Sequence, residues 1–298
     1  MRNESLRSRL LAMLALSISL GVNIPAQETP TSSLTIKTSP GTHVWVDSLR
    51  YGSIPESGEL AVKNLRAGTH TVRLRLKGKR EVSETVKLEA ESQQFIELTL
   101  SVAADKAELS FQEAEELREQ GKHGEAIKGY RIAIKLRPRG YPAARLGLAR
   151  SLMANGAYDG ALAQARTALR EKPGPYPEAH IVIANINRTL GFSEDAIDGY
   201  RTALTQARGL SPEAYTGIAL IYQDRNRLED TIKHYRLAIT QANDTEPIIY
   251  FLLGTTLERE YRNKEAVEAY EKYLQLEPNS AQAASVRSVV RQLKREIR

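Results

Sequence analysis

Residues 191–203 read GFSEDAIDGYRTA, and 70 positions earlier residues 121–133 read GKHGEAIKGYRIA. A small residue and an aromatic position return every 35 residues, as Ala126, Ala161, Ala196, Thr231 and Ala266 and as Tyr130, Ala165, Tyr200, Tyr235 and Tyr270. A proline column keeps the same spacing, at Pro142, Pro177, Pro212 and Pro247. Self-similarity over five such units, from Ala107 to Ala281, predicts a repeat architecture.

Each column has a physical role in a pair of antiparallel helices. Proline is favoured in the first turn of a helix, where its missing N–H costs nothing. Gly121, Gly156 and Gly191, with Asn226 in the same column, fall at the bend between paired helices, where a left-handed backbone is useful. One helical hairpin cannot bury such an apolar face alone, so the units are expected to stack on one another.

A Gly-x-x-x-x-Ala-Ile/Leu pattern recurs at residues 121–127, 156–162 and 191–197. Together with the other columns, this pattern resembles the tetratricopeptide (TPR) repeat. The fourth unit departs from it with Asn226 and Thr231. The resemblance implies five TPR units over residues 107–281, stacked into a solenoid whose first helices line a concave surface for an extended peptide or a partner helix.

Residues 280–298 continue the helical pattern beyond the repeats. Val286, Val290 and Leu293 recur at helical spacing, opposite Arg287 and Arg291. We predict a C-terminal capping helix that covers the last repeat and keeps the array soluble. Contact with a membrane surface or an acidic partner is the alternative use of its basic face.

Ahead of the repeats, residues 34–101 change to a period of two. Apolar and polar residues alternate in six short runs, at residues 34–38, 43–47, 60–63, 71–77, 81–88 and 95–100. Turn residues such as Pro40-Gly41 and Gly78 separate the runs. The pattern predicts a small β-sandwich between linkers at residues 27–33 and 102–106.

This stretch resembles the PEGA domain, a small bacterial β-sandwich of extracytoplasmic proteins. The motifs that carry the resemblance are SPGT, VWVD, GSIP and LRAGTH, at residues 39–42, 44–47, 52–55 and 65–70. The resemblance implies a place in the cell envelope and brings no enzymatic residues with it. The expected fold class is therefore α+β multidomain, a small all-β sandwich followed by an all-α TPR solenoid.

Basic residues alternate along the strand predicted at residues 71–77. Arg73, Arg75 and Lys77 fall on the face opposite to its apolar residues. We interpret them as a solvated face that discourages edge-to-edge association of sheets. The alternative is a contact for an anionic envelope polymer or an acidic protein.

The first 26 residues have the pattern of a secretory signal peptide. Three arginines precede an apolar run from Leu10 to Val22, and Ala26 provides a small residue before a polar one. We predict cleavage after Ala26 and a protein that is exported, periplasmic or secreted; an uncleaved membrane anchor is the alternative. No other apolar stretch is long enough to span a membrane.

Charge and composition exclude several classes of function. The formal net charge is +6, but the excess lies at the two ends, so no broad cationic face for nucleic acid is expected. There is no cysteine, and the five histidines lack metal-ligand spacing. The sequence contains no phosphate-binding loop, dinucleotide fingerprint or nucleophile elbow. We therefore expect no enzyme, no cofactor and no metal site.

Aligning the five units places a set of first-helix residues near the concave groove. Arg150, Asn185 and Arg188 form a cluster that could hold a carboxylate or phosphate by charge-assisted hydrogen bonds. The full candidate set for partner binding is Phe111, Glu115, Arg118, Leu146, Arg150, Met153, Ile181, Asn185, Arg188, Leu220, Gln223, Phe251, Thr255 and Glu258.

The leading hypothesis is a non-enzymatic extracytoplasmic scaffold that binds a protein or peptide partner through the concave TPR groove. A cell-wall or glycan-associated protein that binds an envelope polymer through the PEGA-like module is the first alternative. The second alternative is an accessory subunit of an envelope complex. The sequence does not name the partner or the oligomeric state.

Overall fold

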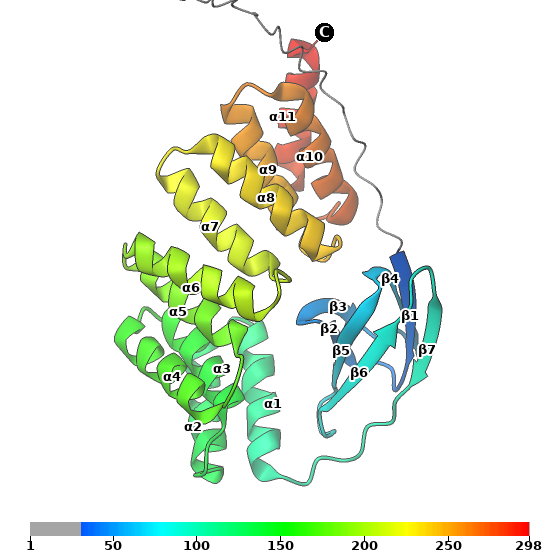
Figure 1. Ribbon diagram of the computed structural model, residues 1–298, viewed down its shortest axis with the longest axis vertical. Coiled ribbons are helices and arrows are strands. Elements are labelled where there is room, and N and C mark those ends of the chain that lie inside the picture. The colour runs from blue at the N-terminus through cyan, green and yellow to red at the C-terminus, as the bar shows by residue number, and fades with distance from the viewer. Residues whose placement is uncertain (1–30, 298) are drawn as a thin grey trace, which may run out of the picture.

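The computed structural model describes residues 31–297, which form a strand-rich unit followed by a curved array of helices (Figure 1). This arrangement confirms the expected fold class, a β-sandwich followed by an all-α solenoid. The predicted export signal at residues 1–26 lies outside the described residues. Within the described part, no helix combines the length and apolar character that are needed to cross a membrane.

Within residues 31–297, seven strands make two sheets that pack face to face. One sheet has the order β4-β1-β7 and the other β3-β2-β5-β6, and only β1 and β7 pair in parallel among the described strands. Alternate residues of the inner faces, such as Leu34 in β1, Val44 in β2 and Leu74 in β5, are fully buried in one core. The strands are β1 (Thr31–Lys37), β2 (His43–Val46), β3 (Leu49–Ser53), β4 (Glu59–Arg66), β5 (Gly68–Arg75), β6 (Val82–Leu88) and β7 (Gln93–Glu97).

The sequence predicts six strands, and β3 is the one it does not predict. Asp47 and Ser48 alone connect β2 to β3, and both have positive φ angles, 50° and 71°. Two consecutive residues with positive φ are the geometry of a type I′ hairpin turn, which is usually signalled by Asn-Gly or Asp-Gly. Because Ser48 takes the place of the glycine, the turn carries no such signal.

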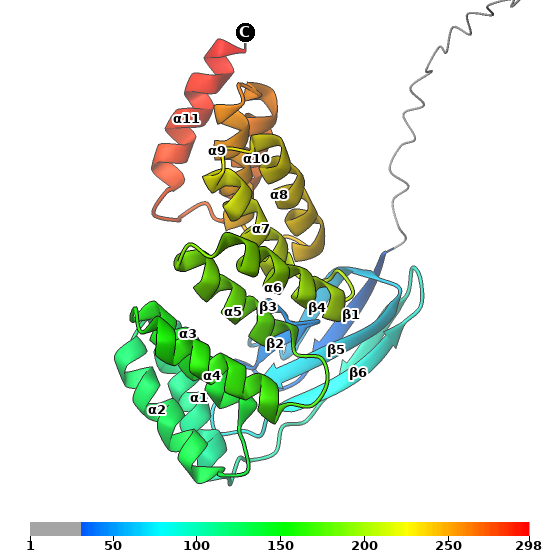
Figure 2. The same ribbon diagram turned by 60° about the vertical axis from the view of Figure 1, so that its left-hand side comes forward.

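The helices form five antiparallel hairpins, α1/α2 to α9/α10, which stack in order, and α11 packs against α10 (Figure 2). The buried face of α11 carries Val286, Val290 and Leu293. The bounds are α1 (Lys106–Glu119), α2 (His123–Leu136), α3 (Pro142–Ala154), α4 (Tyr158–Glu171), α5 (Pro177–Thr189), α6 (Ser193–Gln206), α7 (Pro212–Asp224), α8 (Leu228–Ala242), α9 (Ile248–Arg259), α10 (Asn263–Leu276) and α11 (Ala283–Glu296).

The bend inside each hairpin keeps one backbone conformation whatever residue occupies it. Gly191 has a φ of 85°, and Asn226 and Tyr261 in the same column have φ angles of 55°. Asparagine tolerates this left-handed conformation better than most residues, whereas tyrosine is strained by it. The fourth and fifth units therefore depart from the glycine pattern in sequence but not in the path of the chain.

Three of the four junctions between successive units combine residues of complementary size. A Cβ atom added at Gly217 would lie 2.2 Å from the Tyr200 ring, and one at Gly147 would lie 2.5 Å from the Tyr130 ring. We call each such junction between successive units a seam. At the seam between the second and third units, Ala165 stands in the column of Tyr130 and Tyr200, and Val182 stands in the column of Gly147 and Gly217. Both residues are buried in one core. These three seams each pair a larger residue with a smaller one.

Converting the Tyr200/Gly217 seam into a copy of the Ala165/Val182 seam tests this complementarity. Gly217→Val forces a side chain into the Tyr200 ring and should destabilise the protein by about 1–3 kcal/mol. Tyr200→Ala opens a cavity and should cost about 3–5 kcal/mol. The double variant copies the Ala165/Val182 seam, so urea denaturation followed by circular dichroism should show a smaller loss than the sum of the two.

Gly160→Ala in α4 is the matched control, because the nearest atom to an added Cβ is 3.6 Å away. This variant should be neutral or more stable by about 0.5–1 kcal/mol. Strict additivity of the two seam substitutions would contradict the complementarity.

Candidate functional site

The β-sandwich lies on the concave side of the helical array and docks on its first helix, α1 (Figures 1 and 2). Gln112 of α1 binds the turn after β5 twice, since its Oε1 accepts from the Gly78 N–H at 3.0 Å and its Nε2 donates to the Lys79 carbonyl at 2.6 Å. Glu108 Oε1 accepts from the Glu81 N–H at 2.9 Å. These backbone contacts fix the orientation of the sandwich on α1.

A buried charge network forms the centre of this interface. Arg75 Nη1 donates to Glu115 Oε2 at 3.0 Å, and its Nε donates to Glu81 Oε2 at 2.8 Å. Arg118 Nη2 donates to the same Glu115 oxygen at 3.1 Å, and the Tyr130 hydroxyl donates to the other. Burial alone would raise the pKa of the Glu115 carboxyl, but the charges of Arg118 and Arg75 lower it to about 2.

The interpretation of the basic residues as a solvated face is wrong for Arg75. Arg75 is only 9% exposed, and its guanidinium lies 5.0 Å from the Phe111 ring centre. Lys77 does remain exposed, paired with Glu116 at 2.7 Å. Alternation places these residues correctly on the outer face of the sandwich, but α1 covers that face. The acidic partner of the strand is therefore a helix of the same chain.

A second set of contacts ties the sandwich to later units. The Asn243 side-chain amide, at the end of α8, donates to the Tyr51 hydroxyl at 3.0 Å and to the Lys63 carbonyl at 2.7 Å. The Ser48 hydroxyl donates to Glu178 Oε1 of α5 at 3.1 Å. The sandwich therefore bridges the first, third and fourth units and covers part of the concave surface.

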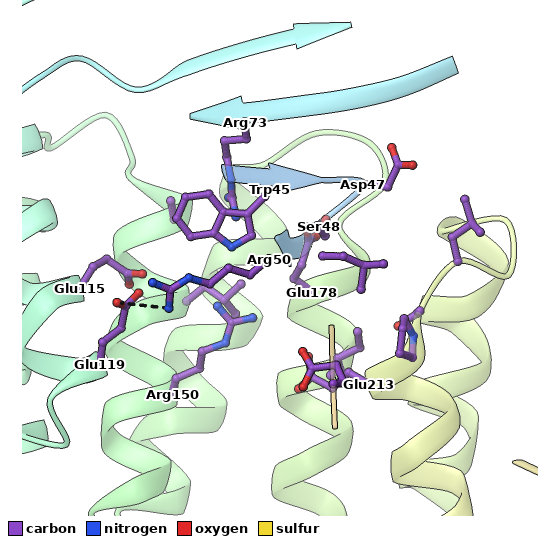
Figure 3. A pocket seen from close by; sticks show the side chains of 18 of the residues that line it. Trp45, Asp47, Ser48, Arg50, Arg73, Glu115, Glu119, Arg150, Glu178 and Glu213 are labelled. Atoms are coloured by element: carbon purple, nitrogen blue, oxygen red, sulfur yellow. Dashed lines mark hydrogen bonds and ion pairs between the residues drawn. The ribbon is translucent and has the colours of Figure 1, made fainter. Parts of the chain in front are cut away.

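The two parts of the chain enclose a cavity of about 510 Å³ (Figure 3). The sandwich contributes the β2–β3 hairpin and β5, and the array contributes α1, α3, α5, α7 and the residues around the start of α9. This volume lies in the usual range for small-molecule pockets, about 300–1,000 Å³. Trp45 of the sandwich and Tyr176 of the array supply aromatic surface, and Ile181 and Ile249 supply apolar surface.

Charged groups of both signs line the cavity, and only some of them are paired. Arg50 Nη1 lies 3.6 Å from Glu119 Oε2, and Arg73 lies with its guanidinium 4.8 Å from the Trp45 ring centre. Arg150 has no hydrogen bond or ion pair to any residue between 31 and 297. Within that range, no group of three or more histidine or acidic residues is placed to hold a metal ion.

The structure divides the predicted groove residues into two groups. Those that line the cavity are Phe111, Glu115, Arg118, Leu146, Arg150 and Ile181. Those that lie outside its lining are Met153, Asn185, Arg188, Leu220, Gln223, Phe251, Thr255 and Glu258. Of the cluster formed by Arg150, Asn185 and Arg188, only Arg150 is therefore a cavity residue.

Several of these polar residues have a partner inside their own unit. The hydroxyl groups of the tyrosine column donate to them, Tyr200 to Asn185 at 2.5 Å and Tyr270 to Glu258 at 2.8 Å. The second unit has alanine in that column, so Arg150 has no tyrosine hydroxyl beneath it. Its side chain extends towards the cavity instead (Figure 3).

Sequence reasoning missed the half of the cavity wall that flanks the proline column. Tyr176 and Glu246 directly precede their prolines, and Glu178, Glu213 and Ile248 directly follow them. The prolines mark where first helices begin, so the signal for this wall was present. The sandwich side, with Trp45, Arg50 and Arg73, depends on a domain contact that no local pattern shows.

Comparisons with known proteins agree with this architecture. Profiles of the tetratricopeptide repeat match residues 111–174 and 248–280. The PEGA domain profile matches residues 31–103. The chain is thus a TPR-repeat protein in class, and its β-sandwich is a PEGA domain.

Solved structures with the same helical fold share little sequence with this chain. A chain of the APC/C hetero-tetramer Cut9–Hcn1 has a TM-score of 0.55 and 17% identity, over 64% of this chain and 37% of that one. A thermophilic TPR protein of Thermus thermophilus has a TM-score of 0.53 and 19% identity, over 63% of this chain and 98% of that one. This chain therefore spans little more than a third of the Cut9–Hcn1 chain. No curated protein matches it in sequence.

Removal of the Arg75 charge tests whether the buried network holds the domains together. Arg75→Met leaves Glu115 without one of its donors and should cost roughly 1.5–3 kcal/mol, the range for a hydrogen bond to a charged group. Hydrogen exchange of the amides in β5 and α1 should become faster. Lys77→Met, which removes an exposed ion pair two residues beyond the end of β5, should change little. Equal effects of the two substitutions would contradict this role.

Acid should weaken the same network. Because the pKa of Glu115 in the folded protein is about 2 and its ordinary value is 4.5, its stabilising effect is complete above pH 4.5 and is lost as the pH falls towards 2. The loss should be on the order of 3 kcal/mol. Urea denaturation at pH 6, 4 and 3 should show the wild type losing its advantage over Glu115→Gln; an advantage independent of pH would contradict this assignment.

Proposed function

We propose that this chain is a non-enzymatic binding protein that takes up a peptide segment of a partner protein between its PEGA domain and the concave TPR surface. TPR arrays generally serve as protein-interaction scaffolds, and that class of function is the starting point. The observation that carries the proposal is the jointly lined cavity of about 510 Å³. A concave, mostly preformed site with a few polar groups is the usual form of a binding site.

Exposed apolar side chains in the cavity wall support a binding role. Leu210, just before α7, is 41% exposed, and Ile248, at the start of α9, is 44% exposed. Both line the cavity, where they continue the buried apolar surface of Ile181 and Ile249. Apolar side chains left in contact with water inside a concave site gain free energy when a ligand covers them.

The PEGA domain decides which part of the groove is available. Its contacts with Glu115 and Gln112 close the concave surface at α1. A bound segment would therefore lie along α3, α5, α7 and α9, with the β2–β3 hairpin as the opposite wall. In this proposal the sandwich is one half of the site, and binding of an envelope polymer by its basic strand is not part of the function.

A structural role accounts for the most deeply buried carboxylate of the cavity. Its most deeply buried carboxylate, Glu115, is held by two arginines and by the Tyr130 hydroxyl. The pKa of Glu115 is lowered to about 2 although burial alone would raise it, so this group does not exchange protons near neutral pH. We assign the group to domain docking.

We also propose that the protein works outside the cytoplasm. PEGA domains are typical of extracytoplasmic proteins, and residues 1–26 have the pattern of an export signal. A peptide partner would then be an exported protein or an exposed segment of an envelope protein.

Selection of peptides on the full chain tests the proposal. A random-peptide display library should yield binders, and Leu210→Asp and Ile248→Asp should each weaken them at least tenfold, because an unpaired carboxylate would lie in the apolar wall. Ile132→Asp in α2, which is 53% exposed outside the cavity, is the matched control and should leave affinity unchanged. The proposed site would be contradicted if the selected peptides lost affinity for Ile132→Asp but kept it for Leu210→Asp and Ile248→Asp.

A further inference from the structure

Several arginine side chains gather around Trp45 at one end of the cavity, where the carboxylates of Glu115, Glu119 and Glu178 also lie. Arg150 has no partner among residues 31–297, and Arg73 lies over the Trp45 ring rather than in an ion pair. Arg50 shares a hydrogen bond of 3.1 Å between its Nη2 and His43 Nδ1, and its Nη1 lies 3.6 Å from Glu119 Oε2. Figure 3 shows the side chains of Arg50 and Arg150 extending into the same space below Trp45.

The wall around the starts of α7 and α9 carries the opposite charge. Glu213 receives one hydrogen bond, from the Asn185 amide at 3.1 Å, and Glu246 receives none among the described residues. No cation within residues 31–297 pairs with either carboxylate. The Glu246 side chain remains open to solvent, yet partial desolvation in the wall and the charge of Glu213 raise the pKa of its carboxyl.

The distance between the two ends suits a short extended chain. α3 contacts α5 and α5 contacts α7, so Arg150 and Glu213 lie on first helices that are two packing distances apart. Helix axes pack about 8–10 Å apart, so the axes of α3 and α7 lie roughly 16–20 Å apart. An extended chain advances about 3.3 Å per residue and covers that distance in five or six residues.

We propose that the segment bound in this cavity carries an acidic side chain held by Arg150 beside Trp45 and, about five residues away, a basic side chain held by Glu213 and Glu246. The proposal rests on the proposed function and adds the charge pattern of the ligand. Each end supplies a charge that the chain itself leaves unmatched, so a segment of this pattern regains the electrostatic free energy lost on entering the cavity. Apolar residues between the two charges would contact Ile181, Leu210 and Ile248.

Trp45 offers a direct measurement, because it is the only tryptophan in the sequence and it lines the cavity. The probes are end-blocked synthetic peptides with the same central leucines, which carry Asp and Lys five positions apart in either order, Asp at both positions, Lys at both, or Gln at both. Titration into the full chain should change Trp45 fluorescence, and one of the Asp/Lys peptides should bind at least tenfold more tightly than the other compositions.

Reversing one charge of the protein should change which peptide composition binds most tightly. Arg150→Glu should make the peptide with two lysines the tightest ligand, and Glu213→Lys should do the same for the peptide with two aspartates. The matched controls are Arg166→Glu in α4 and Glu268→Lys in α10, which are exposed residues outside the cavity. These controls should leave the order of affinities unchanged.

The outcomes separate this inference from the proposed function. If the Gln peptide binds as tightly as the Asp/Lys peptides, and Leu210→Asp still weakens it, the charge pattern is wrong while the peptide site stands. If affinity follows charge but Arg150→Glu and Glu213→Lys do not change the order, the assignment of the two ends is wrong. If no peptide alters Trp45 fluorescence at millimolar concentration, both proposals fail.

Discussion

The ion pair between Arg75 of the sandwich and Glu115 of α1 sets the geometry on which the rest of the molecule depends. Two charges removed from water are costly unless each finds a close partner, and here the carboxylate has three donors while the guanidinium has two carboxylates. Such a network requires one relative position of the domains. The sandwich is held inside the curve of the array, and the space left between them is the partly open cavity of about 510 Å³.

That geometry makes domain docking and ligand binding interdependent. The cavity wall takes Trp45 and Arg73 from the sandwich and Arg150 and Ile181 from the array, so neither part has a complete site alone. A ligand that touches both walls binds the docked state in preference to a separated one. It therefore stabilises the interface by the same free energy by which the interface strengthens its binding.

The repeats could be predicted from sequence because each column has a local cause, such as proline at a helix start or glycine at a bend. The β3 strand could not, since the turn through Asp47 and Ser48 lacks a glycine. The candidate site was predictable only along α1, α3 and the middle of α5. Its other wall belongs to the sandwich, and Arg75 meets a carboxylate 40 residues away in the chain, beyond the reach of any periodicity.

The unequal seams between units have a consequence for how such a chain can change in evolution. Every unit folds as the same hairpin, yet Tyr130 faces Gly147 whereas Ala165 is matched with Val182. Deleting the second unit would bring a tyrosine against a valine, and duplicating it would leave an alanine opposite a glycine, with a void between them. Loss or duplication of the second unit would therefore have to be accompanied by a compensating change in its neighbour.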